Sequence, residues 1–218
     1  MNTVSALGLA GGAALALCQY LVFVHAPVEQ TMGIAQKIFY FHLPVAWWCF
    51  VSFFTACVAG LAYLRSRRAF WDHLEHAAAE WGLVLTTLAL VTGSIWGRCS
   101  WGVWWTWDPR LTTTLVLWFI YAAYLVLRSA GISKAVCAVI AAVGFLDVPL
   151  VFFSARLWRS IHPAVFARKG GGLEPEMAIA VIAMVLCFGL IWAAVLICRT
   201  KQLALSGTAD DLAASEDE

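Results

Sequence analysis

The chain has 218 residues, of which 62% are hydrophobic and only 12% are charged. This balance lies far outside that of soluble globular domains and excludes that class. The formal net charge is only +1 at pH 7, and we expect no nucleic-acid partner. The composition predicts an integral membrane protein whose main solvent is the lipid bilayer.

Six apolar stretches are each close to the ~20 residues that a helix needs to cross about 30 Å of hydrocarbon. None alternates like a barrel strand, and helices satisfy their backbone hydrogen bonds internally. We predict an all-α, polytopic membrane domain over residues 1–200, with spans at 5–25, 40–64, 76–97, 111–128, 135–154 and 177–198. The first span has no basic segment before it and is expected to be a retained anchor. Residues 201–218 are expected to form a disordered cytoplasmic tail.

The basic residues do not decide the orientation. With both termini in the cytoplasm, seven basic residues lie inside, namely Arg65, Arg67, Arg68, Arg128, Lys134, Arg199 and Lys201. Seven also lie outside, namely Lys37, Arg98, Arg110, Arg156, Arg159, Arg168 and Lys169. The positive-inside rule therefore gives no preference. The cluster that ends the second span, at 65–68, favours cytoplasmic termini, which leaves the connections 27–37, 98–110 and 156–176 on the outer side. The alanine-rich composition indicates a bacterial inner membrane, for which the outer side is the periplasm.

Cysteine chemistry is not indicated. Six of the seven cysteines lie in apolar spans, where cysteine behaves as a small hydrophobic residue, and no CxxC pair occurs. A CxxCH motif is also absent, so the chain is not expected to carry covalently attached haem of the c type.

The connection between the third and fourth spans is rich in tryptophan. It holds five tryptophans within twelve residues, together with Arg98, Asp108 and Arg110. An aromatic belt at the level of the lipid headgroups explains the location. A platform for a flat, apolar and anionic ligand explains the density and the basic neighbours, since indoles stack and guanidinium groups pair with carboxylates. The spacing alone leaves both interpretations open.

Three segments resemble a known family. Residues 101–112 read Trp-Gly-Val-Trp-Trp-Thr-Trp-Asp-Pro-Arg-Leu-Thr, and residues 92–97 before them read Thr-Gly-Ser-Ile-Trp-Gly. Residues 40–47 read Tyr-Phe-His-Leu-Pro-Val-Ala-Trp, and residues 158–163 read Trp-Arg-Ser-Ile-His-Pro. This pattern resembles the tryptophan-rich haem-handling membrane proteins of cytochrome c assembly, and within them the CcmC family in size and in number of spans.

The resemblance implies a function and partners. It implies that haem b is bound transiently at the periplasmic face and delivered to the haem chaperone CcmE for c-type cytochrome biogenesis. The other implied partners are CcmD and the ABC transporter subunits CcmA and CcmB. It also implies a haem-binding and haem-transfer protein rather than an enzyme, one that could promote covalent haem attachment to the chaperone.

The same resemblance assigns haem-binding residues. His42 and His162 fall on the positions of the axial ligands to the haem iron, in two outer segments that flank the tryptophan loop. The expected haem platform and propionate partners are Trp101, Trp104, Trp105, Trp107, Asp108, Arg110, Arg156 and Arg159. His25 is expected to be interfacial. His73, His76 and Glu80 share a helix face, where solvation is favoured over a metal site.

One carboxylate inside a span needs an explanation. Asp147 interrupts the fifth span, and a lone carboxylate in hydrocarbon is costly and normally has a partner. We favour a structural ion pair with Arg98 or Arg110 over a role in proton transfer or ligand orientation. Glu80 is expected to be a similar interior group or to reach the interface.

Two other functions compete with haem delivery. A haem permease, or an export subunit of an ABC-type complex, needs a polar path through the bundle. Asp147 and Glu80 are too few polar residues to form such a path. A b-type electron-transfer subunit usually holds haem between histidines on facing helices, and no histidine lies deep in a predicted span.

Overall fold

The computed structural model describes residues 3–162 and 173–216. Within these residues the regular structure is helical, with one isolated bridge between Glu29 and Gly33. The α-helices are α1 (Thr3–Tyr20), α2 (Phe39–Ser66), α3 (Ala69–Trp101), α4 (Pro109–Ser129), α5 (Lys134–Gly144), α6 (Asp147–Leu157) and α7 (Pro175–Glu216). A π-helical turn, Leu21–His25, extends α1, and a 3-10 helix, Ile34–Ile38, precedes α2.

Six helical stretches are long and apolar enough to cross a membrane: Thr3–His25, Ile34–Ser66, Ala69–Trp101, Pro109–Ser129, Lys134–Leu157 and Pro175–Gly207. The prediction of an all-α protein with six transmembrane helices is confirmed. The helices are longer than the predicted apolar stretches, because a helix satisfies its own backbone whether its side chains are apolar or polar. The chain is a multi-pass membrane protein.

Two features of the helices are not visible in the apolar pattern. The fifth span is interrupted between α5 and α6, because Pro149 has no N–H and lies in the first turn of a new helix, where none is needed. The predicted break after residue 200 is absent, and α7 continues to Glu216 in place of a disordered tail. Residues 201–206 are mostly good helix formers, which explains the continuation.

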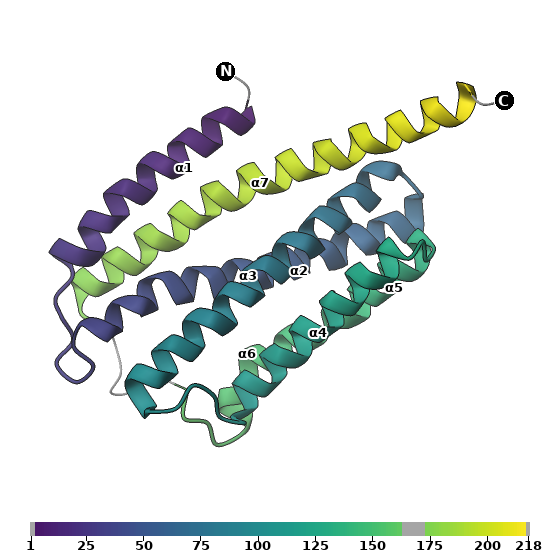
Figure 1. Cartoon of the computed structure of the whole chain (residues 1–218). Helices are drawn as coiled ribbons and strands as arrows, with labels where there is room; N and C mark the ends of the chain where they lie inside the picture. Colours follow the sequence, from purple (N-terminus) through teal and green to yellow (C-terminus); the bar gives the residue numbers. More distant parts are fainter. Residues whose placement is uncertain (1–2, 163–172, 217–218) are drawn as a thin grey trace.

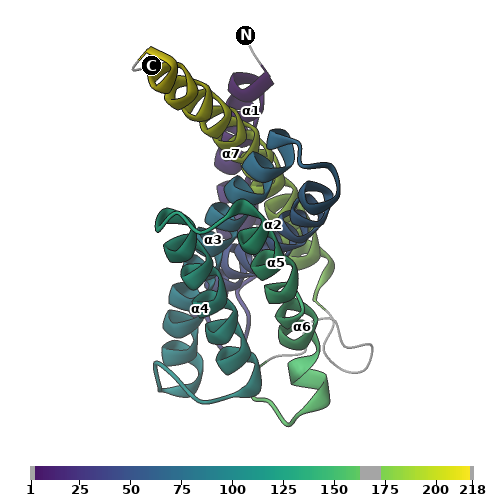
Figure 2. The same ribbon diagram turned by 90° about the vertical axis from the view of Figure 1, so that its right-hand side faces the viewer.

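The helices form three groups (Figures 1 and 2). The long pair α2 and α3 occupies the centre, α1 packs against α7 on one side, and α4, α5 and α6 lie on the other. Both termini are at one end, which we call the terminal end. The connections at 26–33, 102–108 and 158–162 meet at the opposite end, which we call the loop end.

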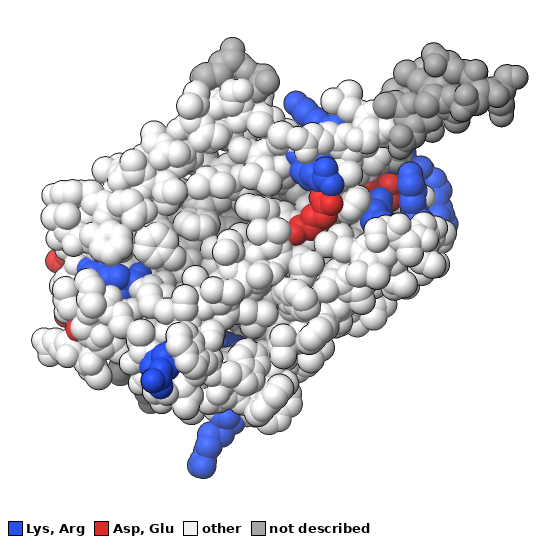
Figure 3. All heavy atoms as spheres, viewed as in Figure 1, with Lys and Arg blue, Asp and Glu red and all other residues white. Residues whose placement is uncertain are grey.

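Charged side chains follow this division. In Figure 3 the blue and red atoms gather toward the two ends, and the broad middle of the visible face is almost entirely uncharged. Many apolar side chains on the helices are exposed outward, including Leu9, Phe119 and Leu186 at 59–65%. Such a surface suits lipid tails rather than water.

Aromatic residues fill the centre of the bundle. Phe53 of α2 stacks on Tyr121 of α4 with ring centroids 3.8 Å apart, and neither side chain is exposed. Trp48 of α2 packs on Trp192 of α7, and its indole N–H donates to the carbonyl of Val185 at 2.8 Å. Bonds of this kind hold helices together where lipid provides little hydrophobic drive.

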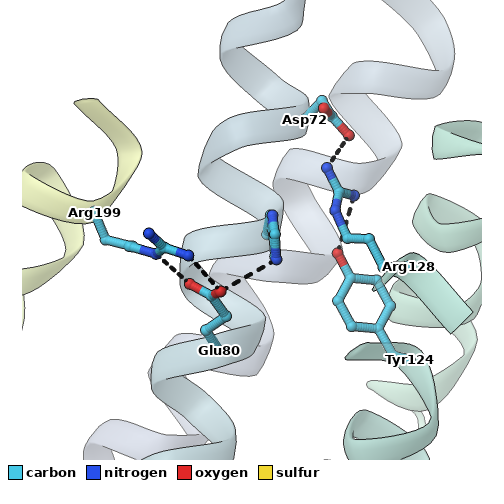
Figure 4. A network of polar contacts seen from close by, with 6 residues as sticks. Asp72, Glu80, Tyr124, Arg128 and Arg199 are labelled. Atoms are coloured by element: carbon cyan, nitrogen blue, oxygen red, sulfur yellow. Dashed lines mark hydrogen bonds and ion pairs between the residues drawn. The ribbon is translucent and has the colours of Figure 1, made fainter. Parts of the chain in front are cut away.

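Ion pairs link the helices near the terminal end (Figure 4). Glu80 of α3 receives two hydrogen bonds from Arg199 of α7, at 2.6 and 2.7 Å, and lies 3.3 Å from His76. Arg128 of α4 donates to the buried Asp72 of α3 at 2.7 Å. Glu80 is thus a paired but partly exposed carboxylate. No three metal-ligating side chains cluster anywhere in the part of the chain that is described.

A buried lysine closes the loop end of the first span. Lys37 is 3% exposed, and its ammonium donates to the carbonyls of Val22 and Ala26 at 2.7 and 2.6 Å. These carbonyls lie at the end of the π-helical turn, where they lack helical partners. Lys37 therefore serves the fold, although the charge balance counted it as a loop residue.

Gly189 tests the contact between α2 and α7. A Cβ at Gly189 would overlap the indole of Trp48, which is held by its hydrogen bond to Val185 and by its contact with the ring of Trp192. We expect Gly189→Ala to lower the free energy of unfolding by about 1–3 kcal/mol through overpacking. Gly12→Ala is the control, since a Cβ there meets nothing within 4 Å. Thermal unfolding in detergent measures both variants, and equal stabilities would contradict the predicted contact.

The two ion pairs should differ in strength. Asp72 and Arg128 are 1% and 12% exposed, whereas Glu80 and Arg199 are 27% and 40% exposed. Removing one partner of a buried pair costs about 3–5 kcal/mol, and removing one partner of an exposed pair costs about 1 kcal/mol or less. We therefore expect Arg128→Met to lower the denaturation midpoint clearly more than Arg199→Met. The reverse order would refute the assignment of Asp72 as the buried charge.

Candidate functional site

A cavity opens between α2, α3, α4 and α6 at the loop end. Its empty volume is about 1480 Å³, counting the open mouth. The lining is mainly apolar and aromatic, and it carries two histidines and two arginines: His42, His162, Arg110 and Arg156. Concave, mostly apolar sites with a few convergent polar groups are typical of ligand binding.

His42 is held by the facing helix. It lies in the first turns of α2, and its Nδ1 is 3.0 Å from the hydroxyl of Thr92 on α3. The next residue, Gly93, leaves room for the ring, since a Cβ there would lie 3.1 Å from Cε1 of His42. Because α2 begins at Phe39, His42 lies within the helix, and its ring faces α3.

His162 is positioned through Asp108. The Asp108 carboxylate caps α4 by accepting from the backbone N–H of Arg110 at 2.9 Å. It also accepts from the hydroxyl of Ser160 at 3.0 Å and from the backbone N–H of Ile161 at 2.9 Å. Asp108 thus ties the segment that follows α6 to the end of the tryptophan loop. This places His162 over the cavity.

The two histidine rings lie close together. Their centroids are 6.4 Å apart. Trp96, which is buried, packs against both rings at 5.9 and 6.5 Å. One guanidinium nitrogen of Arg110 is 3.2 Å from Nδ1 of His162, and another donates to the carbonyl of Phe152 at 3.1 Å. The fold thus brings together residues that are 120 positions apart in the sequence.

Two buried donors in this region have no acceptor among the described residues. They are Nε of Arg110 and the indole N–H of Trp96, and both residues line the cavity. An unsatisfied buried donor is costly. A bound carboxylate would satisfy the guanidinium, so the lining suits an apolar ligand that carries anionic groups.

Only some of the tryptophans predicted to form the haem platform line the cavity. Trp101 and Trp105 line the cavity, whereas Trp104 and Trp107 are 59% and 76% exposed and lie outside its lining. Trp107 packs edge-on against Trp105 with centroids 5.8 Å apart. Two tryptophans of this loop thus line the cavity, and two lie outside it.

Of the other predicted haem-binding residues, two line the cavity and two do not. Arg110 and Arg156 line the cavity, and Arg156 lies over the ring of Phe152. Arg159 is exposed and is not part of the lining. Asp108 positions the backbone and is likewise outside the lining.

The predicted ion pair of Asp147 with Arg98 or Arg110 was wrong. Arg98 donates to the carbonyl of Gly102, and Arg110 contacts His162 and Phe152. Oδ2 of Asp147 is buried and has no hydrogen-bond partner among the described residues. Asp147 is instead the first residue of α6, where the helix dipole favours a carboxylate. The interruption of the fifth span, which the apolar pattern did not reveal, created this position.

Thr92, Gly93 and Trp96 were not assigned a role from the sequence. All three belong to the Thr-Gly-Ser-Ile-Trp-Gly segment that supported the family resemblance. Their spacing was the available signal, because Thr92 and Trp96 are four residues apart, Gly93 and Trp96 are three apart, and such pairs are neighbours on a helix surface. Which neighbour they face depends on how α3 packs on α2.

Asp108 offers a graded test of how the two loops are joined. Asp108→Asn keeps one acceptor oxygen but replaces the other with a donor, so the amide of Ile161 loses its partner in one orientation of the side chain. We expect the Ile161 amide to exchange hydrogen faster in Asp108→Asn and fastest in Asp108→Ala. Glu29→Gln, in another connection of the loop end, is the control. Unchanged exchange at Ile161 in Asp108→Ala would show that other contacts hold this segment.

Comparison with known proteins gives a consistent identity. The family model of CcmC, heme exporter protein C, matches residues 2–214. Heme exporter protein C of Escherichia coli K12 is 30% identical over 187 residues, which cover 84% of this chain and 76% of that protein. Heme exporter protein C of Bradyrhizobium diazoefficiens is 35% identical over 173 residues, 77% of this chain and 66% of that protein. A putative cytochrome c biosynthesis ccmC-like mitochondrial protein of Marchantia polymorpha is 29% identical over 192 residues, 88% of this chain and 83% of that protein. Because the family match spans nearly the whole chain, this protein belongs to the CcmC family, heme exporter protein C.

Proposed function

We propose that this protein binds haem b transiently in the cavity at its loop end and delivers it to the haem chaperone CcmE. The observation that carries the proposal is the 6.4 Å between the rings of His42 and His162. An imidazole nitrogen binds a metal at about 2.0–2.1 Å, so two imidazoles on opposite sides of one metal have centroids roughly 6 Å apart. The two rings therefore suit axial ligation of a single iron.

The cavity lining supports the same ligand. Haem is flat and apolar, and it carries two propionate groups at one edge. Trp101 and Trp105 offer ring faces and edges to such a ligand. Arg110 and Arg156 are placed to pair with the carboxylates, and Arg110 has an unsatisfied donor available. Trp104 and Trp107 would then cover the open side of the porphyrin from outside the lining.

The proposed orientation places the loop end in the periplasm and both termini in the cytoplasm. The basic turn at 65–68 lies at the terminal end, in accord with the positive-inside rule. The basic residues of the loop end would then owe their position to ligand binding. The proposed partners at that face are CcmE and the small protein CcmD, and the proposed ABC transporter subunits are CcmA and CcmB.

A path for haem across the whole bilayer through this chain is less well supported. The cavity ends at the level of Cys49, Phe50 and Ala89. Beyond it the centre is filled by the stacked rings of Phe53 and Tyr121, neither of which is exposed. A permease needs a continuous path, whereas capture and transfer at one face need only the cavity. The proposed role is accordingly haem binding and transfer rather than catalysis, with assistance to covalent attachment on the chaperone.

Visible spectra of three histidine variants test the proposal. The protein is purified with co-expressed chaperone, and haem in both proteins is quantified. We expect His42→Ala and His162→Ala to lose the six-coordinate bis-histidine spectrum and to load the chaperone with less haem. His25→Ala is the control, because His25 is exposed at the end of the first span and outside the cavity. An unchanged spectrum in both cavity variants would refute the ligand assignment.

A further inference from the structure

The hydrogen bonds of His42 define which ring nitrogen carries the proton. The hydroxyl of Thr92 has one proton, which it donates to the carbonyl of Leu88 at 2.7 Å. The same oxygen can therefore only accept from Nδ1 of His42, 3.0 Å away. His42 is thus protonated on Nδ1, and the lone pair on Nε2 is available.

The hydrogen bond between Arg110 and the ring of His162 indicates the opposite arrangement. A guanidinium group has donors only. Because the nitrogen of Arg110 lies 3.2 Å from Nδ1 of His162, this Nδ1 must accept. A neutral imidazole has one protonated nitrogen, so the proton of His162 is on Nε2. The two histidines therefore differ in tautomer, although their rings are 6.4 Å apart.

This difference has a consequence for metal binding, which needs an unprotonated nitrogen. His42 can offer Nε2 without any rearrangement. His162 can offer Nδ1 only after Arg110 leaves it. It can offer Nε2 only after the proton moves to Nδ1, which Arg110 also prevents. The contact with Arg110 therefore has to change before His162 can bind a metal.

We propose that the two histidines load in a fixed order, with His42 as the preset first ligand and His162 as a second ligand released by Arg110. This inference rests on the proposed function and concerns how the same site is controlled. A propionate accepts two charge-assisted hydrogen bonds from Arg110, which outcompete its single bond to a neutral imidazole. The proton of His162 then exchanges through water from Nε2 to Nδ1, and the freed Nε2 binds the iron. No net proton is taken up or lost, and the same steps in reverse free the iron from His162 first.

Thr92 and Arg110 are positioning residues in this scheme, because each acts through a histidine. Arg110 links recognition of the propionate edge to completion of the iron coordination. A porphyrin without free carboxylates would then bind through His42 alone. This coupling distinguishes the scheme from one in which both histidines are equivalent ligands.

Nitrogen NMR of the haem-free protein tests the tautomers without any bound porphyrin. The chain has five histidines, so ¹⁵N-histidine signals can be assigned by single substitution. We expect His42 to be protonated on Nδ1 and His162 on Nε2. Thr92→Val should weaken the preference of His42, and Arg110→Met should remove that of His162. Identical tautomers at the two positions, or a cationic His162 at neutral pH, would overturn the inference.

Iron protoporphyrin dimethyl ester, whose propionates are blocked, tests the coupling. With wild-type protein we expect a five-coordinate, high-spin spectrum for the ester and a six-coordinate, low-spin spectrum for the free acid. Arg110→Met should make the ester six-coordinate, whereas Arg159→Met, outside the cavity lining, should leave it five-coordinate. A six-coordinate ester complex in wild type would overturn the inference while leaving the proposed function intact. Failure of wild type to bind the free acid would instead overturn the proposed function, with the NMR result still deciding the tautomers.

Discussion

The carboxylate of Asp108 is the interaction on which the candidate site depends. It is 8% exposed and receives hydrogen bonds from the N-terminus of α4 and from Ser160 and Ile161. Bonds to an ionised acceptor are stronger than neutral ones. They join the tryptophan loop to the segment after α6, the segment that carries His162.

The rest of the bundle keeps this end rigid. Phe53 and Tyr121 fill the centre, Trp48 and Trp192 join α2 to α7, and the Asp72–Arg128 pair joins α3 to α4 near the terminal end. Because α2 and α3 are each continuous from one end of the bundle to the other, contacts far from the cavity also position Thr92 against His42. A site that must accept and release its ligand thus lies at the edge of a closely packed core.

The number of helices could be predicted because lipid imposes a simple rule. A span must be apolar for about 20 residues, and this pattern is readable in any sequence. Helix ends were less predictable, since polar residues such as Asp72 continue a helix when another helix supplies a partner. The partner of Asp147 was wrongly predicted for a related reason. Its position depends on a break between α5 and α6 that the apolar pattern does not show.

Of the candidate site, the sequence indicated the residue types and the tertiary structure decided the roles. His42, His162 and the tryptophan loop stood out through composition and family resemblance, because their local pattern is unusual. The split between Trp105 in the cavity and Trp107 outside it depends on the path of the loop. The path of the chain also decides that Arg110 lines the cavity and that Arg159 lies outside it.

The sequence by itself therefore determined that lipid surrounds the helices and how many helices cross the membrane. It also determined which types of side chain lie in the connections at one end of the molecule. Only the tertiary structure decided which nitrogen of each histidine carries a proton. The physical reason is that a tautomer is set by hydrogen-bond partners, and those partners are Thr92 and Arg110. Each lies about 50 residues from its histidine, at a contact that only the packing of α2 on α3 and the bond network of Asp108 create.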